Sequence, residues 1–179
     1  VVYATAERVD ATRKQVILAD GKSLEYDFVI VSPGIELKWG ALEGYDQAAS
    51  ELVPHAWKAG EQTLLLRKQL QAMSDGGVVY LSVPANPYRC PPGPYERASL
   101  IAHYLKEHKP KSKVIILDSK DSFSKQALFE EGWAKLYGKN VEWVGGSGDG
   151  KVVRVDAKNL TLHTDLSEHK GAVLNVIPP

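Results

Sequence analysis

Residues 77–118 constrain the fold most tightly, because their pattern predicts a strand, a tight loop, a helix and a second strand. Gly77–Val83 is a short run of apolar and β-branched residues, which is typical of a buried strand. Residues 97–108 have helical spacing, with one apolar face expected to hold Leu100, Ile101, Tyr104 and Leu105. Lys113–Asp118 is a second buried strand that ends in an acid. Strands joined by a helix predict a parallel sheet with a right-handed crossover.

The loop between the first strand and the helix contains the sequence Cys-Pro-Pro-Gly-Pro-Tyr-Glu-Arg over Cys90–Arg97. A dinucleotide-binding fold would carry glycines here, which bring a pyrophosphate close to a helix N-terminus. Proline has no backbone N–H and stiffens the chain, so the loop is predicted to hold a thiol instead of a dinucleotide. Cys90 precedes a helix N-terminus, where the helix dipole favours a thiolate. The alternative is a small buried hydrophobe.

Other groups near this loop have both a chemical and a structural interpretation. Glu96 in the first helical turn is either a complement to the helix dipole or a proton acceptor close to the thiol. Arg97 could pair with an acid at the surface. Asp118 stands where dinucleotide-binding folds keep a ribose-binding acid, or else it caps the next turn. The five histidines lack metal-ligand spacing, so no metal site is expected.

Two segments, 8–34 and 154–179, resemble each other, and each is expected to form a three-stranded β-meander. Both contain a Val-Asp-Ala strand end, a polar turn, an alternating strand, a second polar turn and an apolar strand closing on Pro-Gly or Pro-Pro. The first closes on Ser32-Pro33-Gly34, which either ends a strand or brings backbone near a flavin nucleotide, a close approach that Gly34 permits. Chance similarity between two generic hairpins is the alternative explanation of the repeat.

Between the meanders the pattern predicts α/β structure, with further helices at 55–73 and about 125–137 and a strand at 141–144. The predicted fold class is therefore α/β: an NAD(P)-binding-like three-layer domain at 51–179, with a parallel sheet and an inserted β-meander. Residues 1–50 are expected to be the end of a first, FAD-binding segment, whose β-meander precedes that domain. The opening residues Val1–Thr5 resemble the middle of a sheet, so the chain is expected to be part of a longer protein.

Composition excludes some classes of partner. The chain has 22 basic and 22 acidic residues and no polybasic run, so neither nucleic acid nor an anionic membrane is expected as a partner. No apolar segment approaches the roughly 20 residues of a spanning helix. The single cysteine cannot form an internal disulfide.

These motifs resemble the flavoprotein subunit family of flavocytochrome c sulfide dehydrogenase. The resemblance covers essentially the whole chain, and it is carried by the loop above and by residues 54–63, 108–119, 123–126 and 175–179. It implies a disulfide-reductase-like fold with FAD in the first domain, flanked here by Ser32, Pro33 and Gly34. It also implies a redox-active cysteine pair, of which Cys90 matches one member and the other lies outside these residues. The second domain would be an NAD-like fold that has lost NAD.

The resemblance also implies a mechanism and a location. Hydrosulfide would open the cysteine disulfide and form a persulfide. The released thiolate, for which Cys90 is the candidate, would pass electrons to FAD, and a c-type cytochrome subunit would accept them. Cys90 and Glu96 would be the catalytic residues, with Glu96 handling the proton, in a periplasmic enzyme. The fragment alone is expected to hold no FAD and to turn over no sulfide. The alternatives are a sulfide:quinone reductase, an NAD(P)H-dependent disulfide reductase, and a non-catalytic redox module with an inert Cys90.

Overall fold

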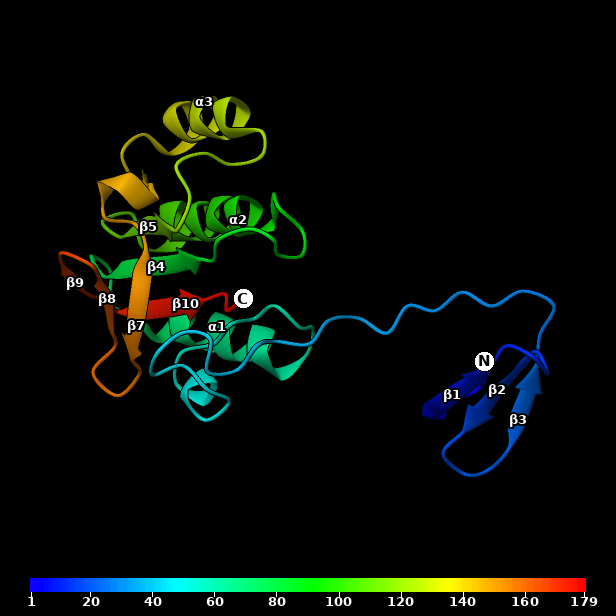
Figure 1. The fold of residues 1–179 in the computed structure, drawn as a ribbon. Coiled ribbons are helices and arrows are strands. Elements are labelled where there is room, and N and C mark those ends of the chain that lie inside the picture. Colours follow the sequence, from blue (N-terminus) through cyan, green and yellow to red (C-terminus); the bar gives the residue numbers. More distant parts are fainter. The chain divides into compact units, whose positions relative to one another are not determined.

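The computed structural model describes all 179 residues and divides them into two compact units, Val1–Gly34 and Ile35–Pro179 (Figure 1). The first unit is an antiparallel meander in the order β1-β2-β3, formed by Ala6–Asp10, Gln15–Leu18 and Ser23–Glu25. Its third strand is therefore a short polar one, and the apolar run Phe28–Val31 is not in a strand, contrary to the sequence prediction. Phe28 and Ile30 are 94% and 92% exposed. An apolar sequence forms a strand only where another strand pairs with it, and none does so here.

The second unit is built on a four-stranded parallel sheet in the order β10-β4-β5-β6. Its strands are β4 (Val78–Val83), β5 (Lys113–Asp118), β6 (Val141–Val144) and β10 (Val173–Val176). Val83 is paired with Asp118, so the carboxyl ends of the two central strands lie side by side. The parallel sheet predicted from residues 77–118 is thus confirmed.

Three helices cover one face of this sheet: α1 (Glu61–Ala72), α2 (Gly93–His108) and α3 (Gln126–Tyr137). The buried residues of α2 recur at helical spacing and pack against the inward side chains of β4. They include Ala98, Ile101, Ala102 and Leu105. Leu100 is 72% exposed, so its predicted place on the buried face is wrong. The helix predicted at 55–73 begins only at Glu61, because Gly60 precedes it with φ +113°. None of the helices combines the length and hydropathy that a membrane span requires.

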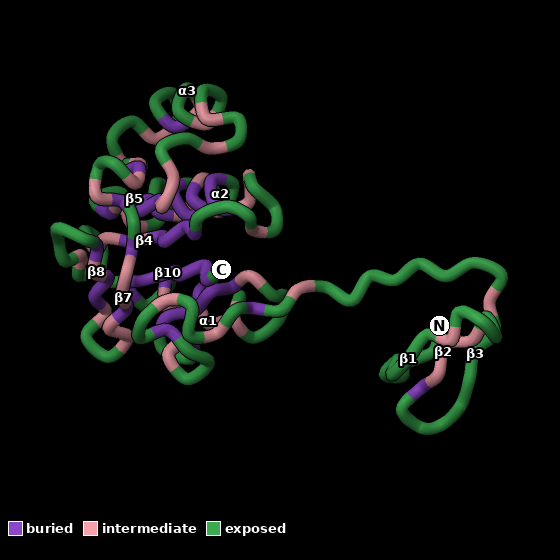
Figure 2. The backbone as a smooth tube through the Cα atoms, viewed as in Figure 1, coloured by how far each residue is buried: buried purple, intermediate pink, exposed green.

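A second meander covers the opposite face of the sheet, and it consists of β7 (Val152–Asp156), β8 (Thr161–Thr164) and β9 (Glu168–Lys170). The apolar strand that the sequence assigned to this meander is β10, which joins the parallel sheet beside β4 instead. All four residues of β10 are buried, as are most of those in β4 and β5 (Figure 2). Helices, parallel sheet and meander make the three layers of the predicted α/β fold.

Residues 35–50 pack with the second unit. The Tyr45 hydroxyl donates to the carbonyls of Val53 (2.8 Å) and Val176 (3.3 Å), and Gly44 lies directly against the Val155 carbonyl. A short 3₁₀ turn at Ala49–Glu51 follows, and another lies at Gly146–Gly148, between β6 and the second meander. The contacts thus divide the chain at 34/35, whereas the predicted domain boundary is 50/51. The assignment of residues 1–50 to a FAD-binding segment stays a prediction.

Candidate active site at the carboxyl ends of the parallel strands

Cys90 lies in the loop between β4 and α2, as the sequence predicted, and its side chain is exposed. Its φ is +60°, a left-handed conformation that costs a residue with a Cβ about 1–2 kcal/mol. The Cys90 carbonyl accepts a hydrogen bond from the Gly93 N–H at 2.9 Å, which closes a turn over the two prolines. The loop therefore presents the thiol just before the first turn of α2, in a conformation that the rest of the structure must maintain.

Gly93 lets this turn pack against an aromatic ring. A Cβ at Gly93 would lie 2.8 Å from Cη2 of Trp57 and 3.2 Å from Sγ of Cys90. The thiol and the indole are thus both within contact distance of one point beside the Gly93 Cα. Gly93 is therefore required because the Trp57 side chain packs against it. In a dinucleotide-binding loop, by contrast, glycines let the backbone approach a phosphate.

Arg97 fixes the segment that carries Trp57. Its guanidinium donates to the carbonyls of His55 (2.9 Å) and Ala56 and to Oδ1 of Asn175 (3.1 Å), and it lies 5.1 Å from the centre of the Trp57 ring. Burial lowers the pKa of Arg97 to about 10. No carboxylate lies within ion-pair distance, so the surface ion pair considered for this residue is wrong.

His55 and Asn175 also hold the segment that carries Trp57, and the sequence analysis predicted a role for neither. The fully buried Asn175 donates from Nδ2 to the carbonyls of Pro54 (2.6 Å) and His55 (2.9 Å). Nδ1 of His55 accepts the Trp57 N–H at 2.8 Å, so the neutral imidazole carries its proton on Nε2. Burial, helped by Lys58 and Arg97, lowers the pKa of His55 to about 4. A polar Asn within the apolar β10 was the one signal in the sequence.

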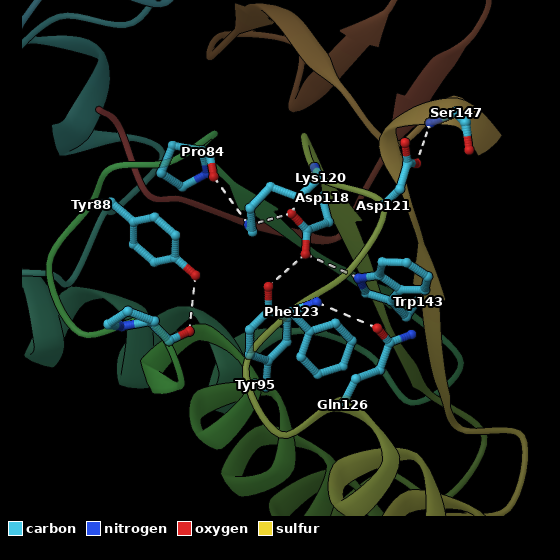
Figure 3. Close-up of polar contacts among 11 residues, drawn as sticks. Pro84, Tyr88, Tyr95, Asp118, Lys120, Asp121, Phe123, Gln126, Trp143 and Ser147 are labelled. Carbon is cyan, nitrogen blue, oxygen red and sulfur yellow. Dashed lines mark hydrogen bonds and ion pairs between the residues drawn. The ribbon is translucent and has the colours of Figure 1, made fainter.

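Asp118 is closed off by its neighbours (Figure 3). It is 0% exposed, and its Oδ2 accepts the Tyr95 hydroxyl at 2.6 Å and the Trp143 indole N–H at 3.0 Å. Its Oδ1 accepts Nζ of Lys120 at 2.5 Å and the Lys120 backbone N–H at 3.1 Å. Burial and the hydrogen bond to Asp118 raise the pKa of Tyr95. A ribose could reach this carboxylate only by displacing one of these donors, whereas the turn-capping role matches the Lys120 N–H contact.

Lys120 also contacts the loop that carries Cys90. Its Nζ donates to the Pro84 carbonyl at 3.2 Å and lies 4.9 Å from the centre of the Tyr88 ring. The Tyr88 hydroxyl in turn donates to the Pro91 carbonyl at 2.9 Å. These contacts occupy the space between the strand ends and the loop, where a dinucleotide fold would seat its ligand.

The remaining predicted site residues are exposed. Glu96 lies in the first turn of α2, close in sequence to the loop, and its carboxylate makes no hydrogen bond or ion pair within the chain. Ser32, Pro33 and Gly34 follow β3 in the first unit, and Gly34 has φ +86°. The catalytic role of Glu96 and the flavin contact of residues 32–34 stay predictions.

Comparison with known proteins shows which family this chain matches. The family model of the sulfide dehydrogenase (flavocytochrome c) flavoprotein chain, central region, matches residues 63–178, more than half of the chain. The mitochondrial sulfide:quinone oxidoreductase of Dictyostelium discoideum is 28% identical over 102 residues, which are 55% of this chain and 22% of that protein.

Solved structures show the same fold. The sulfide:quinone oxidoreductase of Aquifex aeolicus superposes with a TM-score of 0.69 at 19% identity, covering 99% of this chain and 42% of that one. A ferredoxin reductase of Rhodopseudomonas palustris superposes with a TM-score of 0.66 at 10% identity, covering 98% and 40%. The chain thus spans about a fifth of the curated relative and about two fifths of these structures.

Proposed function

This chain belongs to the family of the sulfide dehydrogenase (flavocytochrome c) flavoprotein chain, and we propose that it carries one thiol of a FAD-dependent enzyme that oxidises sulfide. The observation that supports this is the exposed Cys90, held at positive φ before the N-terminus of α2 against Gly93 and Trp57. A structural cysteine would be buried and would not need a strained backbone. A reactive one needs access and an electropositive setting, which the helix N-terminus provides.

The proposed reaction begins with a disulfide between Cys90 and a second cysteine that is not among these residues. Hydrosulfide attacks the sulfur of the second cysteine; the S–S bond breaks, a persulfide forms there and Cys90 leaves as a thiolate. The proton of hydrosulfide goes to a base, for which the exposed carboxylate of Glu96 is the candidate. The two electrons given up by sulfide then reside on the Cys90 thiolate.

Residues 32–34 of the first unit are the candidates for contact with a flavin nucleotide. The backbone N–H groups of Ser32 and Gly34 have no partner within the chain, and a Cβ at Gly34 would meet nothing within 4 Å, so a ligand can approach. Bound FAD would supply a two-electron acceptor for the thiolate and a one-electron donor to a c-type cytochrome. That cytochrome partner and a periplasmic location rest on the family resemblance alone.

The same enzyme is proposed to bind no nicotinamide nucleotide, because the residues at the strand ends do not fit one. Three prolines replace phosphate-binding N–H groups, and Asp118 already accepts hydrogen bonds from Tyr95, Trp143 and Lys120. Calorimetric titration of the whole flavoprotein with NADH and NADPH should give no heat of binding. Micromolar binding of either nucleotide would contradict this proposal.

The decisive experiment is Cys90→Ser in the whole flavoprotein with its cytochrome. We expect loss of sulfide-dependent cytochrome reduction, with FAD still bound and dithionite still able to reduce both cofactors. Reduction of cytochrome by sulfide at the parental rate would show that Cys90 is not a catalytic residue and would favour the inert redox module. Glu96→Gln should lower the rate of sulfide oxidation and alter its pH profile. Glu107→Gln, which changes another exposed acid on α2, should do neither.

A quinone acceptor is the second candidate, because sulfide:quinone oxidoreductases are found among both the curated relatives and the solved structures. The two functions share the thiol chemistry and differ in where the electrons go. Sulfide-dependent reduction of a soluble ubiquinone analogue, without reduction of cytochrome c, would favour the quinone enzyme over the proposed one.

A further inference from the structure

A groove of about 610 Å³ runs between α1 and α2, on the helical face of the second unit. Its apolar walls come from one stripe on each helix, with Leu66 and Leu70 four residues apart on α1 and Ile101 and Tyr104 three apart on α2. Leu100 stands at the edge and is 72% exposed. Pockets for small molecules have volumes of roughly 300–1,000 Å³ and mostly apolar walls.

The charged residues of the groove are both basic. Arg67 and Arg97 line it together with His108, and no aspartate or glutamate does. Arg97 is the most constrained of them, because its guanidinium is partly buried and has no carboxylate partner. Its three hydrogen bonds to Ala56, His55 and Asn175 leave about two of the five guanidinium N–H groups free. A buried charge of this kind is costly unless an anion compensates it.

We propose that this groove binds a free single-chain aliphatic carboxylate, with its head at Arg97 and its chain along Leu66, Leu70 and Ile101. The distance along α2 from Arg97 to His108 is about 16 Å, which accommodates a medium-length acyl chain. The carboxylate would supply the charge that the protein does not provide, and the stripe would take the chain out of water. The proposal does not depend on the sulfide chemistry, because Cys90 and Glu96 do not line the groove.

The test is a calorimetric titration of the whole flavoprotein with decanoate. Decanoate should bind, octanoate should bind about tenfold more weakly for the loss of two methylene groups, and the uncharged decanol should bind much more weakly than decanoate. Equal binding of decanol and decanoate would overturn the role of Arg97. Absence of decanoate binding below its micellar concentration would overturn the site itself.

Two exposed leucines offer a matched pair of variants. Leu100→Glu places an acid at the edge of the groove and should weaken decanoate binding at least tenfold. Leu64→Glu places the same acid on α1 outside the groove, where Leu64 is 63% exposed, and should leave binding unchanged. Equal effects of the two variants would contradict the proposal. A different outcome would indicate a membrane-surface contact instead. In that case the protein would not bind decanoate but would sediment with anionic phospholipid vesicles, and Leu100→Glu would abolish this sedimentation.

Discussion

The same substitution, glycine to alanine, should have opposite effects on stability at two helical positions. Gly132 lies within α3, and a Cβ there would meet nothing within 4 Å. Gly132→Ala should therefore raise the free energy of unfolding by about 0.5–1 kcal/mol, the ordinary helix-propensity gain. Gly93 begins α2, and a Cβ there would lie 2.8 Å from Cη2 of Trp57.

The Trp57 ring cannot simply move away from an alanine at 93. Arg97 lies over the ring, and that guanidinium is held by the carbonyls of His55 and Ala56 and by the side chain of Asn175. Overpacking of this kind costs about 1–3 kcal/mol, which exceeds the propensity gain at a first helical position. We expect Gly93→Ala to lower the free energy of unfolding by about 1–2 kcal/mol.

Urea unfolding monitored by tryptophan fluorescence measures both effects, because all four tryptophans lie in the second unit. A second measurement is the rate at which Cys90 reacts with iodoacetamide. It should rise in Gly93→Ala, since Sγ lies 3.2 Å from the added methyl and the turn must open. The reasoning is refuted if Gly93→Ala is as stabilising as Gly132→Ala, or if the thiol reacts at an unchanged rate.

Two further predictions concern buried ionisable groups. Because the pKa of His55 is about 4 in the fold against 6.5 as the ordinary value, the unfolded state takes up the proton first as pH falls. The protein should therefore lose about 3 kcal/mol of stability between pH 6.5 and 4; His55→Gln should flatten this loss in pH-dependent unfolding and the exposed His103→Gln should not. Asp118→Asn should cost about 3–5 kcal/mol by leaving the Lys120 ammonium without its carboxylate. Its combination with Lys120→Met should cost less than the sum of the single variants, and additive costs would contradict the pairing.

The elements of the parallel sheet could be predicted because their signals are local. Lys113–Asp118 and Val141–Val144 are strands with the predicted bounds, since short apolar runs between turns need no distant information. The partner of a strand is not local information. The sequence pattern predicts the run at Val173–Val176 as a strand of the meander. In the structure all of its residues are buried, which is typical of a parallel strand covered on both faces.

The candidate site was predictable only along the chain. The proline-rich loop and the place of its cysteine before α2 follow from adjacent residues, whereas the exposure of the thiol is known only from the structure. The contacts that shape the site join residues far apart in sequence: Arg97 reaches back to His55 and forward to Asn175. Likewise, Asp118 has the position of a ribose-binding acid, yet Tyr95 and Trp143 decide what it binds. Sequence position indicated the kind of residue, and tertiary contacts determined its role.

The internal repeat bears on the proposed flavin contact of residues 32–34. In the second unit, a meander is followed by the apolar strand β10, which pairs with β4, and the Val176 N–H at its end donates to the Pro54 carbonyl. In the first unit, the same order gives a meander, the apolar run Phe28–Val31 and then residues 32–34. Phe28–Val31 corresponds to β10 in the sequence repeat but is exposed, so its apolar side chains suit a neighbouring strand. Residues 32–34 would then follow a sheet strand at its carboxyl end, where α/β folds bind ligands, and this is the physical basis for proposing the flavin contact there.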